Sequence, residues 1–452
     1  MEMERQPHVL LFPFPAQGHI KPMLTLAQLL CHAGIHVTFL NTELNHHLLT
    51  QRQALSARFP TLHFHSISDG LPSDHPRTIA VYYQDIVASL RSKTAPLLCQ
   101  FLISKKNNVD KDSAAAAAAA QLPPLGCVIT DGIMCFAIDA AEEVGIPVIV
   151  LPITSACSFW CYSCIPNLIQ EAQLPFEDED MDRIVSGVPG MEGLLRRRDL
   201  PSICRMPTDH PIMQFYIKET KAITRASALI LNTFDDLESS ILSHLAPRFS
   251  KIYTIGPLHA LLKSRIKDDD LSSSSSSAAA TASLRQEDRR CMTWLDTQRL
   301  GSVIFISFGS LVKLTRVELL EFWHGLVSSG TPFLWVLRSD VLWSDEGEHM
   351  GQVIPTELEM GTKERGFIVD WVPQEEVLAH EAVGGFLTHS GWNSTLEGIW
   401  AGVSMLCWPK LADQQVNSRC VGRFAKLARN SVSESGSSYH NLQQLIQDLR
   451  NL

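Results

Sequence analysis

Short apolar runs alternate with stretches of helical periodicity through the first half of the chain. Residues 8–14 (HVLLFPF) form an apolar run typical of a buried strand. Residues 22–33 place Leu24, Ala27 and Leu30 on one face of a helix. Further strands are predicted at 36–41, 125–131 and 147–152, and a further helix at 137–144. Buried runs separated by helices predict parallel strands joined by crossover helices.

The same alternation resumes in the second half, after a change of composition. Strands are predicted at 302–307, 333–338, 367–370 and 385–388, with helices at 291–295, 318–328, 375–379 and from about Asn393. Two low-complexity tracts, 113–120 and 267–283, lack the apolar variety needed to pack a core and predict surface loops. The second tract is the natural domain boundary.

This pattern predicts two doubly wound α/β domains and a terminal helix. The expected parts are an N-terminal domain at 1–257, a linker with the serine-rich loop at 258–290, a C-terminal domain at 291–436 and a helix at 437–452. Leu442, Leu445, Ile446 and Leu449 form the apolar stripe of that helix.

Composition narrows the classes of function. A formal net charge of −10 disfavours a nucleic-acid or anionic-membrane partner. No uninterrupted apolar stretch reaches the roughly 18 residues that a membrane span needs, and the first apolar run ends early in Pro and Gly. We therefore expect a cytoplasmic protein whose 11 cysteines are reduced. Cys157, Cys161 and Cys164 lie in an apolar segment and are interpreted as core thiols rather than metal ligands.

A histidine and an aspartate follow two of the predicted strands of the first half. His19 comes after the first strand, next to Gln17 and Gly18, and Asp131 ends the strand LGCVITD. In a parallel sheet both would reach the same edge. A histidine suits a general base near neutral pH, and a carboxylate on its far ring nitrogen would orient it. We therefore predict a catalytic pair of His19 and Asp131.

The segment 371–414 concentrates polar and aromatic residues between glycine turns. Within it, residues 385–398 (GFLTHSGWNSTLEG) read as a strand, a glycine turn and a helix start, which suits a diphosphate. His389 and Ser394 stand where they could add hydrogen bonds. Taken alone, Asn393 and Ser394 would equally suit an ordinary N-cap, with Glu397 completing a capping box.

Taken together, residues 371–414 resemble the signature box of plant secondary-product UDP-sugar glycosyltransferases. The stretches PFPAQGHIKPM, VITDG and FISFGSL extend the resemblance over nearly the whole chain. It implies the GT-B fold, with two facing Rossmann-like domains and a cleft between them. The N-terminal domain would hold mainly the acceptor and the C-terminal domain the UDP-sugar. The final helix would pack back on the N-terminal domain.

The resemblance also assigns roles to residues. Trp371 would stack on uracil, Val372 would contact its edge through the backbone, and Gln374 and Glu397 would hold the ribose. Ser310, His389, Asn393 and Ser394 match diphosphate contacts, and Trp392, Asp413 and Gln414 match positions that face the sugar. A glutamine at 414 with Trp392 resembles glucose-using members. His19 and Asp131 match the catalytic dyad of the family.

The implied activity is metal-independent, inverting transfer of glucose from UDP-glucose to a hydroxyl or carboxyl of a small hydrophobic acceptor. The product would be a β-glucoside, UDP-glucose would be the donor substrate, and no cofactor is expected. The pattern is closest to branches that glucosylate terpenoid or iridoid aglycones, with phenolic acceptors as the other class. A monomer is expected. Phe14, Met134, Phe136, Phe159 and Trp160 are interpreted either as acceptor-pocket walls or as core.

The end of the chain departs from the family. After DQQVNSRCV the family continues with a strand and a helix, whereas here GRFAKLARNSV follows at once. The C-terminal domain is therefore expected to lack one strand and one helix, which would expose a sheet edge. This leaves an alternative function, namely a truncated, weakly active or inactive isoform that at most binds UDP-sugar.

Overall fold

The chain forms two compact units in a computed structural model. The structure describes residues 7–49, 52–107, 122–176, 180–266, 283–338, 342–343, 362–363, 365–408, 416–417 and 421–452. Unit 1 comprises Met1–Leu284 and Leu427–Leu452, and unit 2 comprises Arg285–Lys426. Both low-complexity tracts lie outside the described residues except for Ser283.

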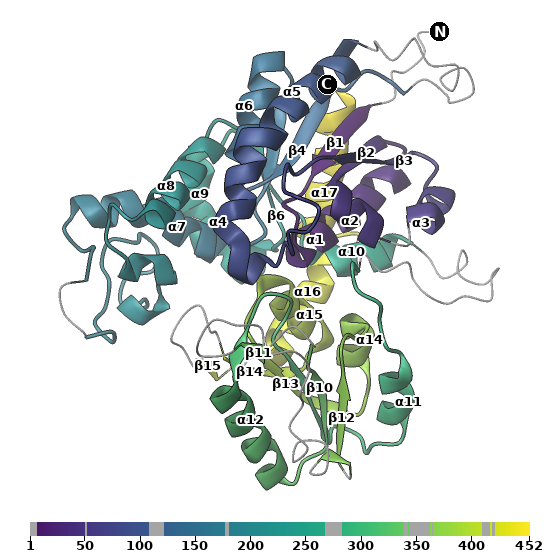
Figure 1. Cartoon of the computed structure of the whole chain (residues 1–452), viewed down its shortest axis with the longest axis vertical. Coiled ribbons are helices and arrows are strands. Elements are labelled where there is room, and N and C mark those ends of the chain that lie inside the picture. The colour runs from purple at the N-terminus through teal and green to yellow at the C-terminus, as the bar shows by residue number, and fades with distance from the viewer. Residues whose placement is uncertain are drawn as a thin grey trace. The chain divides into compact units, whose positions relative to one another are not determined.

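Unit 1 is built on a seven-stranded sheet in the order β3-β2-β1-β4-β5-β6-β7, in which every pairing is parallel (Figure 1). Its strands are β1 His8–Phe12, β2 His36–Thr42, β3 Leu62–Ile67, β4 Cys127–Asp131, β5 Val148–Leu151, β6 Ala228–Leu231 and β7 Ile252–Thr254. The strand order reverses between β1 and β4, which is where ligands bind in open parallel sheets. The predicted parallel sheet with crossover helices is confirmed.

The helices of unit 1 are α1 Gln17–His32, α2 Glu43–Leu48, α3 Arg52–Arg58, α4 Ile79–Ser89, α5 Ala95–Asn107, α6 Cys135–Val144, α7 Ala156–Gln170, α8 Pro211–Ile223, α9 Asp235–Leu245, α10 Leu258–Arg265 and α17 Ser437–Arg450. Short helical turns lie at Leu90–Thr94, Arg197–Asp199, Ser202–Arg205 and Ala246–Arg248. Helix α16, Val421–Val432, crosses the limit between the units.

Helix α1 begins earlier than the sequence pattern predicts. It starts at Gln17 and contains the buried Pro22, which the pattern placed at the start of the helix. Gly18 and His19 interrupt the apolar periodicity, and a proline is usually found in the first turn of a helix. His19 therefore lies in the first helical turn and not in a loop before it.

The core of unit 1 includes the residues for which two interpretations were open. Phe14, Met134, Phe136, Phe159 and Trp160 all belong to one buried cluster, and each is 7% exposed or less. The interpretation as core residues holds for all five. Cys161 and Cys164 belong to the same cluster, and burial raises the pKa of these two thiols to about 12 and about 11. The described cysteines are free thiols.

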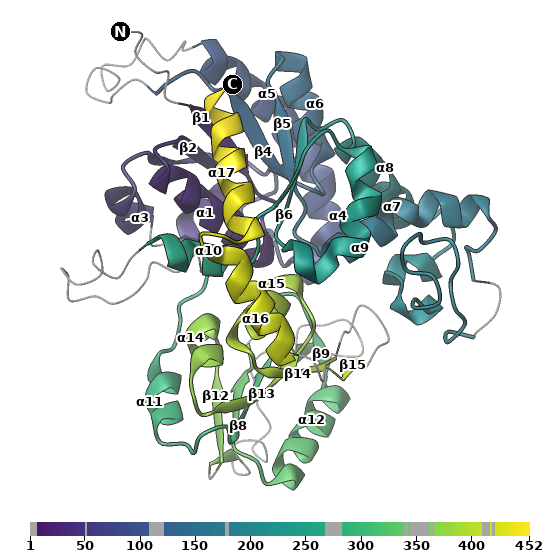
Figure 2. The ribbon, with the colours of Figure 1, turned by 180° about the vertical axis from the view of Figure 1, so that it is seen from behind.

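Helix α17 packs against β7, the outermost strand of the unit 1 sheet (Figure 2). Leu442, Leu445, Ile446 and Leu449 are its buried apolar residues, each 5% exposed or less. Asn441 Nδ2 donates to Thr254 Oγ1 at 2.7 Å, and Lys251 Nζ pairs with Asp448 Oδ2 at 2.8 Å. The apolar stripe read from the sequence is thus the face that the helix buries.

Unit 2 has a smaller mixed sheet in the order β12-β10-β8-β13-β14-β15. Its elements are α11 Arg290–Asp296, β8 Val303–Ser307, β9 Leu314–Thr315, α12 Arg316–Ser329, β10 Phe333–Val336, β11 Leu342–Trp343, β12 Gly366–Val369, α14 Gln374–Ala379, β13 Val383–Thr388, α15 Trp392–Ala401, β14 Ser404–Cys407 and β15 Val416–Asn417. Strands β9 and β11 form a separate pair. With two parallel α/β units, the chain has the predicted GT-B fold class.

The unit 2 sheet ends weakly on the β14 side. Within the described residues, the outer side of β14 pairs only with β15, which is antiparallel and two residues long. Leu406 on β14 is 54% exposed. The sequence departs from the family pattern at residues 422–432, from which a missing strand is predicted. These residues come soon after β14 and β15 in the chain.

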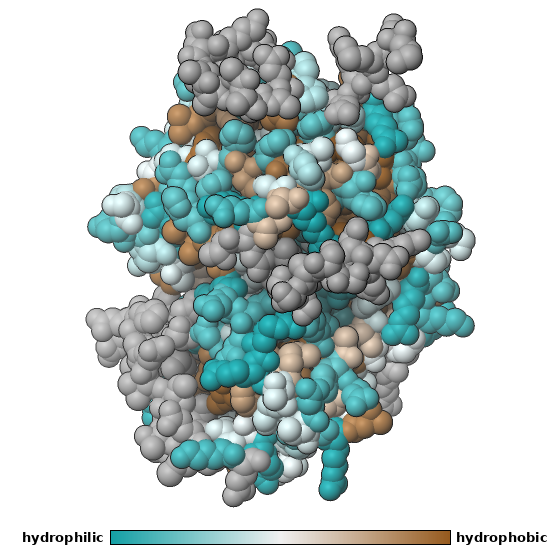
Figure 3. Space-filling view, turned by 90° about the vertical axis from the view of Figure 1, so that its right-hand side faces the viewer, coloured by the Kyte–Doolittle hydropathy of each residue, from teal (hydrophilic) through white to brown (hydrophobic). Residues whose placement is uncertain are grey.

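The face of the molecule in Figure 3 is largely hydrophilic, and its hydrophobic residues form small separate groups. Such a surface is ordinary for a globular protein. Among the helices that the structure describes, none is long and apolar enough to cross a membrane.

Candidate active site

In unit 1, His19 and Asp131 form a hydrogen-bonded pair. Nδ1 of His19 lies 2.7 Å from Oδ2 of Asp131. The pair forms because β1 and β4 are adjacent and parallel, so α1 after β1 and the last residue of β4 meet at one edge of the sheet. A carboxylate only accepts hydrogen bonds, so Nδ1 carries the proton and Nε2 is the basic nitrogen.

Burial and backbone contacts fix this pair in place. The side chain of Asp131 is 1% exposed and that of His19 is 22% exposed. The amide of Ile133 donates to Oδ1 of Asp131 at 3.3 Å, and the amide of Phe14 lies 3.5 Å from Oδ2. The carboxylate is therefore held rigidly, while the histidine keeps access to solvent. This is the arrangement that a general base and its orienting carboxylate require.

In unit 2, His389 lies between two glycine turns. It follows β13, and a Cβ placed on Gly309 would stand 2.4 Å from Cε1 of His389. A Cβ on Gly391 would stand 2.3 Å from its Nε2. Gly309 also has a φ of +67°, which a side chain disfavours. Both turns need glycine so that the imidazole can fit between them.

His389 is neutral at physiological pH. Burial lowers its pKa to about 4, and the positive charge of Arg338 acts in the same direction. A hydrogen bond between the His389 ring and the backbone of Ser307 opposes this lowering of the pKa. The Oγ of Ser390 is buried without a hydrogen-bond partner among the described residues. Ser390 itself has a φ of +64°. Buried polar groups are normally satisfied, so this turn fits a ligand that exchanges hydrogen bonds with it.

Arg338 is a structural member of this site that the sequence reasoning missed. The residue is 3% exposed, and its guanidinium donates to the carbonyl of Gly309 and, at 3.1 Å, to that of Val312. It thereby fixes the turn that contains Ser310. The available signal was an arginine at the end of the apolar run FLWVLR, since a buried charge requires partners.

Three of the expected nucleotide-binding residues lie together. Nε2 of Gln374 donates to Oγ of Ser394 at 2.9 Å and to Oε2 of Glu397 at 2.7 Å. Gln374 is the first residue of α14, whereas Ser394 and Glu397 lie on α15. The structure thus brings the two expected ribose contacts, Gln374 and Glu397, into direct contact.

The alternative of an ordinary capping box is wrong. The N-cap of α15 is Gly391, which has no side chain with which to cap the helix. Ser394 and Glu397 are directed to Gln374 instead, because the helix begins at Trp392, earlier than a cap at Asn393 or Ser394 would require. The N-cap residue itself therefore supplies no side-chain acceptor to the first turn, as suits a helix N-terminus that binds an anion.

The remaining expected contacts are distributed over the same unit. Trp371 is half-buried, its carbonyl accepts from the amide of Asp288 at 2.8 Å, and the guanidinium of Arg285 lies 5.7 Å from its ring centroid. Val372 is buried, and Trp392 and Asn393 are the first residues of α15. Asp413 and Gln414 lie outside the described residues.

A search of the described residues finds no group of three or more histidine, cysteine, aspartate or glutamate side chains arranged to hold a metal ion.

Comparison with known proteins places the chain among sugar transferases. Residues 279–449 match the family described as UDP-glucoronosyl and UDP-glucosyl transferase. The 7-deoxyloganetic acid glucosyltransferase of Catharanthus roseus is 44% identical, over 100% of this chain and 99% of the relative. Mogroside I-A1 synthase of Siraitia grosvenorii is 49% identical, over 93% of this chain and 77% of the relative.

Among solved structures, Os79 from O. sativa in complex with UDP superposes with a TM-score of 0.75 at 25% sequence identity. The match covers 98% of this chain and 100% of Os79. The alignment with the Catharanthus relative runs over 493 positions, against the 452 residues of this chain. The difference in length therefore lies inside the alignment and not at its ends.

Proposed function

Because the chain belongs to the family of UDP-glucuronosyl and UDP-glucosyl transferases, we propose that it transfers glucose from UDP-glucose to a small hydrophobic acceptor, with inversion. The observation that carries the proposal is the 2.7 Å contact between His19 and the buried Asp131. This contact provides the base. In unit 2, Gln374, Ser394 and Glu397 lie together at the start of α15, whose N-cap is a glycine.

The proposed step is a direct displacement. Nε2 of His19 removes the proton from the acceptor hydroxyl as its oxygen attacks the anomeric carbon, and Asp131 stabilises the imidazolium that forms. The bond between the anomeric carbon and the diphosphate breaks, and UDP leaves. One displacement without a covalent sugar–enzyme intermediate inverts the configuration, so UDP-α-glucose gives a β-glucoside. A carboxyl acceptor would attack as the carboxylate.

The donor contacts are assigned to unit 2. The N-terminus of α15, His389 and the turn with Ser310 would receive the diphosphate, with Asn393 and Ser394 adding hydrogen bonds. Trp371 would stack on uracil beside the backbone of Val372. His389 is neutral, so it would act as a hydrogen-bonding group and not as a counter-charge. These donors would stabilise the leaving group, and the proposal therefore needs neither a metal ion nor a cofactor.

The sugar is assigned to Trp392, Asp413 and Gln414. A site that binds hydroxyls by hydrogen bonds rejects a sugar with one hydroxyl inverted, because buried partners are left unpaired. We therefore expect a higher kcat/KM for UDP-glucose than for UDP-galactose, and Gln414→His should change that ratio. Equal kcat/KM values for the two donors would remove this assignment.

The acceptor class is inferred from the relatives. The names of two of them refer to 7-deoxyloganetic acid and a mogroside, which suggests a terpenoid or iridoid aglycone for this chain, with phenolics as the other class. Full alignment with the first relative argues against the alternative of a truncated, inactive isoform. We also propose that the enzyme is a monomer and that it is cytoplasmic. Free thiols at its described cysteines are consistent with the second part, because the cytosol keeps thiols reduced.

The test is turnover of UDP-glucose with a panel of terpenoid, iridoid and phenolic acceptors, with products identified by mass spectrometry. NMR of the product would give the anomeric configuration, and a β-glucoside is expected. An α-glucoside, or release of glucose without any glucoside from the whole panel, would contradict the proposal. A calorimetric titration with UDP measures the donor site separately from the acceptor.

A further inference from the structure

A series of aromatic rings continues from His19 across unit 1. The ring of Phe14 lies 5.2 Å from that of His19, and Tyr83 lies 6.1 Å from Phe14. Phe215 then lies 6.1 Å from Tyr83, and Tyr216 lies 5.2 Å from Phe215. Each step is an ordinary distance between interacting rings. The rings come from the segment after β1, from α4 and from α8.

We call Tyr83, Tyr162, Phe215 and Tyr216 the aromatic patch. Tyr162 on α7 stacks on Tyr216 with ring centroids 5.0 Å apart and an interplanar angle of 23°. All four side chains are intermediate in exposure, unlike the fully buried Phe14 at the start of the series. Tyrosine provides apolar area and a polar tip, which suits a surface that binds a small molecule.

The patch contains a directed pair of hydroxyls. The hydroxyl of Tyr83 donates to that of Tyr216 at 3.3 Å. Tyr216 is the acceptor in this pair, so its own hydroxyl hydrogen is available for another acceptor. Burial raises the pKa of both phenols, so both remain neutral donors at physiological pH. A hydroxyl that accepts one hydrogen bond becomes a better donor of the next.

The cation beside the patch is already neutralised. The guanidinium of Arg91 lies 4.7 Å from the ring centroid of Phe215 and forms an ion pair with Glu219. The side chain of Glu219 is 1% exposed, and it also accepts from the amide of Cys135 at 2.7 Å. Removing Arg91 from this carboxylate would leave a buried unpaired charge, which is costly. Arg91 therefore supports the patch and does not attract an anionic ligand.

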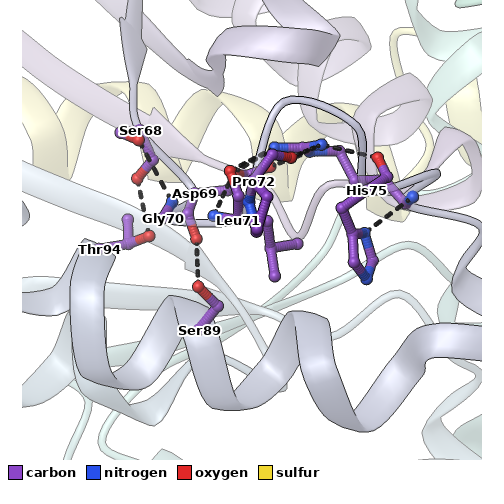
Figure 4. A network of polar contacts seen from close by, with 9 residues as sticks. Ser68, Asp69, Gly70, Leu71, Pro72, His75, Ser89 and Thr94 are labelled. Carbon is purple, nitrogen blue, oxygen red and sulfur yellow. Dashed lines mark hydrogen bonds and ion pairs between the residues drawn. The ribbon is translucent and has the colours of Figure 1, made fainter.

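Helix α4, which carries Tyr83, is tied down at both ends (Figure 4). Arg77, with a left-handed φ of 52°, donates from Nε and Nη2 to the two oxygens of Asp69 at 2.7 and 3.0 Å. At the far end of α4, Oγ of Ser89 donates to the carbonyl of Asp69 at 2.7 Å. Such a clamp keeps Tyr83 in position before any ligand binds, which lowers the cost of binding.

We propose that the aromatic patch binds the body of the acceptor and that the hydroxyl of Tyr216, assisted by Tyr83, donates to a neutral oxygen of that acceptor remote from the glucosylated hydroxyl. This inference rests on the proposed function, since it places the acceptor against the four partly exposed rings of the patch, which are joined to His19 through the buried Phe14. It narrows the proposed acceptors to neutral hydrophobic molecules with a distal carbonyl, ether or hydroxyl oxygen, and it thereby sets this chain apart from the relative that is named for 7-deoxyloganetic acid.

The test uses three acceptors with one reactive hydroxyl each. One carries a distal carbonyl, the second has methylene in its place, and the third has a carboxylate. For Tyr216→Phe, the KM for the carbonyl acceptor should rise about 10-fold, with kcat changed less than about 2-fold and no change for the methylene acceptor. Tyr83→Phe should raise the same KM by about 2- to 5-fold. Tyr82→Phe, on the same helix, is the matched control.

Acceptor Kd values measured by calorimetry in the presence of UDP distinguish a failure of this inference from a failure of the proposed function. If wild-type protein turns over the carbonyl acceptor but Tyr216→Phe does not distinguish it from the methylene acceptor, the inference fails and the proposed function stands. If wild-type protein shows no turnover but Tyr216→Phe weakens only the carbonyl acceptor, the proposed function fails and the binding site stands. A carboxylate acceptor that binds as tightly as the neutral one would overturn the stated acceptor class.

Discussion

Each unit places a histidine beyond the C-terminal end of a parallel strand, and the two imidazoles are held in opposite ways. His19, after β1, is partly exposed and is bonded to a buried carboxylate at 2.7 Å. His389, after β13, is enclosed by two glycine turns, has a pKa lowered to about 4, and has Arg338 nearby instead of a carboxylate. Similar positions in similar sheets thus give one residue suited to accept a proton and one suited to stay neutral.

The two sheets also differ in how their outer strands are covered. Unit 1 has an all-parallel sheet, and its outermost strand β7 is packed against by α17. In unit 2, β14 pairs with β13 on one side and, within the described residues, only with the two-residue β15 on its other side. His19 and His389 both follow parallel strands, but their surroundings differ. The surroundings of a residue at a strand end therefore decide its chemical role more than the strand order does. Four predictions test it, beginning with the largest expected effect.

Replacing His19 by alanine should abolish glucosylation and leave UDP affinity nearly unchanged. The loss of general-base assistance should cost on the order of 10²–10⁴ in kcat, whereas the proposed nucleotide contacts are all in unit 2. Steady-state kinetics and calorimetric titration with UDP provide the two measurements. Retention of more than about a tenth of wild-type turnover would show that His19 is not the base.

Replacing Gly391 by alanine should weaken UDP binding by about 10-fold or more, because the new Cβ would stand 2.3 Å from Nε2 of His389 and must displace the ring. Its φ of −59° tolerates a side chain, so the effect is steric. Gly325→Ala is the matched control. That glycine lies within α12 with open space around it, and alanine there should stabilise the protein by roughly 0.5–1 kcal/mol. Unchanged UDP affinity in Gly391→Ala would remove His389 from the site.

Stability should fall as the pH is lowered from about 6.5 towards about 4. Burial lowers the pKa of His8 in unit 1 and of His389 in unit 2 from 6.5 to about 4, so in this window the unfolded chain binds more protons than the folded one. The stability that these neutral histidines contribute is present above the unfolded pKa and is lost as the pH falls through the folded pKa. Urea unfolding at several pH values measures it, and His8→Asn should make the dependence shallower. A midpoint independent of pH across this window would contradict the assignment.

Restoring a strand and a helix after β14 should give the smallest effect. A version that carries the corresponding segment of the Catharanthus relative should melt a few °C higher, because covering the exposed half of Leu406 contributes about 1 kcal/mol. We expect higher turnover as well, because the support of α15 would improve. The same melting temperature and the same turnover in a side-by-side comparison would mean that the short sheet edge does not weaken unit 2.

The pattern of the sequence was sufficient for the fold class and for most elements. The run at 385–388 lies within β13, and the strand predicted at 125–131 is observed from Cys127 to the same last residue, Asp131, because apolar runs must be buried whatever the partners are. Errors arose where a functional residue interrupts the pattern, as at Gly18 and His19, which begin a helix that the apolar spacing places later. The aromatic patch was missed because its rings come from separate helices with no shared spacing.

The sequence by itself determined which residue types are available for chemistry: a histidine after one strand, an aspartate at the end of another, and glycines around a second histidine. Only the tertiary structure decided their states. Asp131 is oriented by amides of Phe14 and Ile133, and His389 is kept neutral by burial and by Arg338, a residue 51 positions away in the sequence. Hydrogen bonds and desolvation depend on what surrounds a group in space, and order along the chain does not specify that.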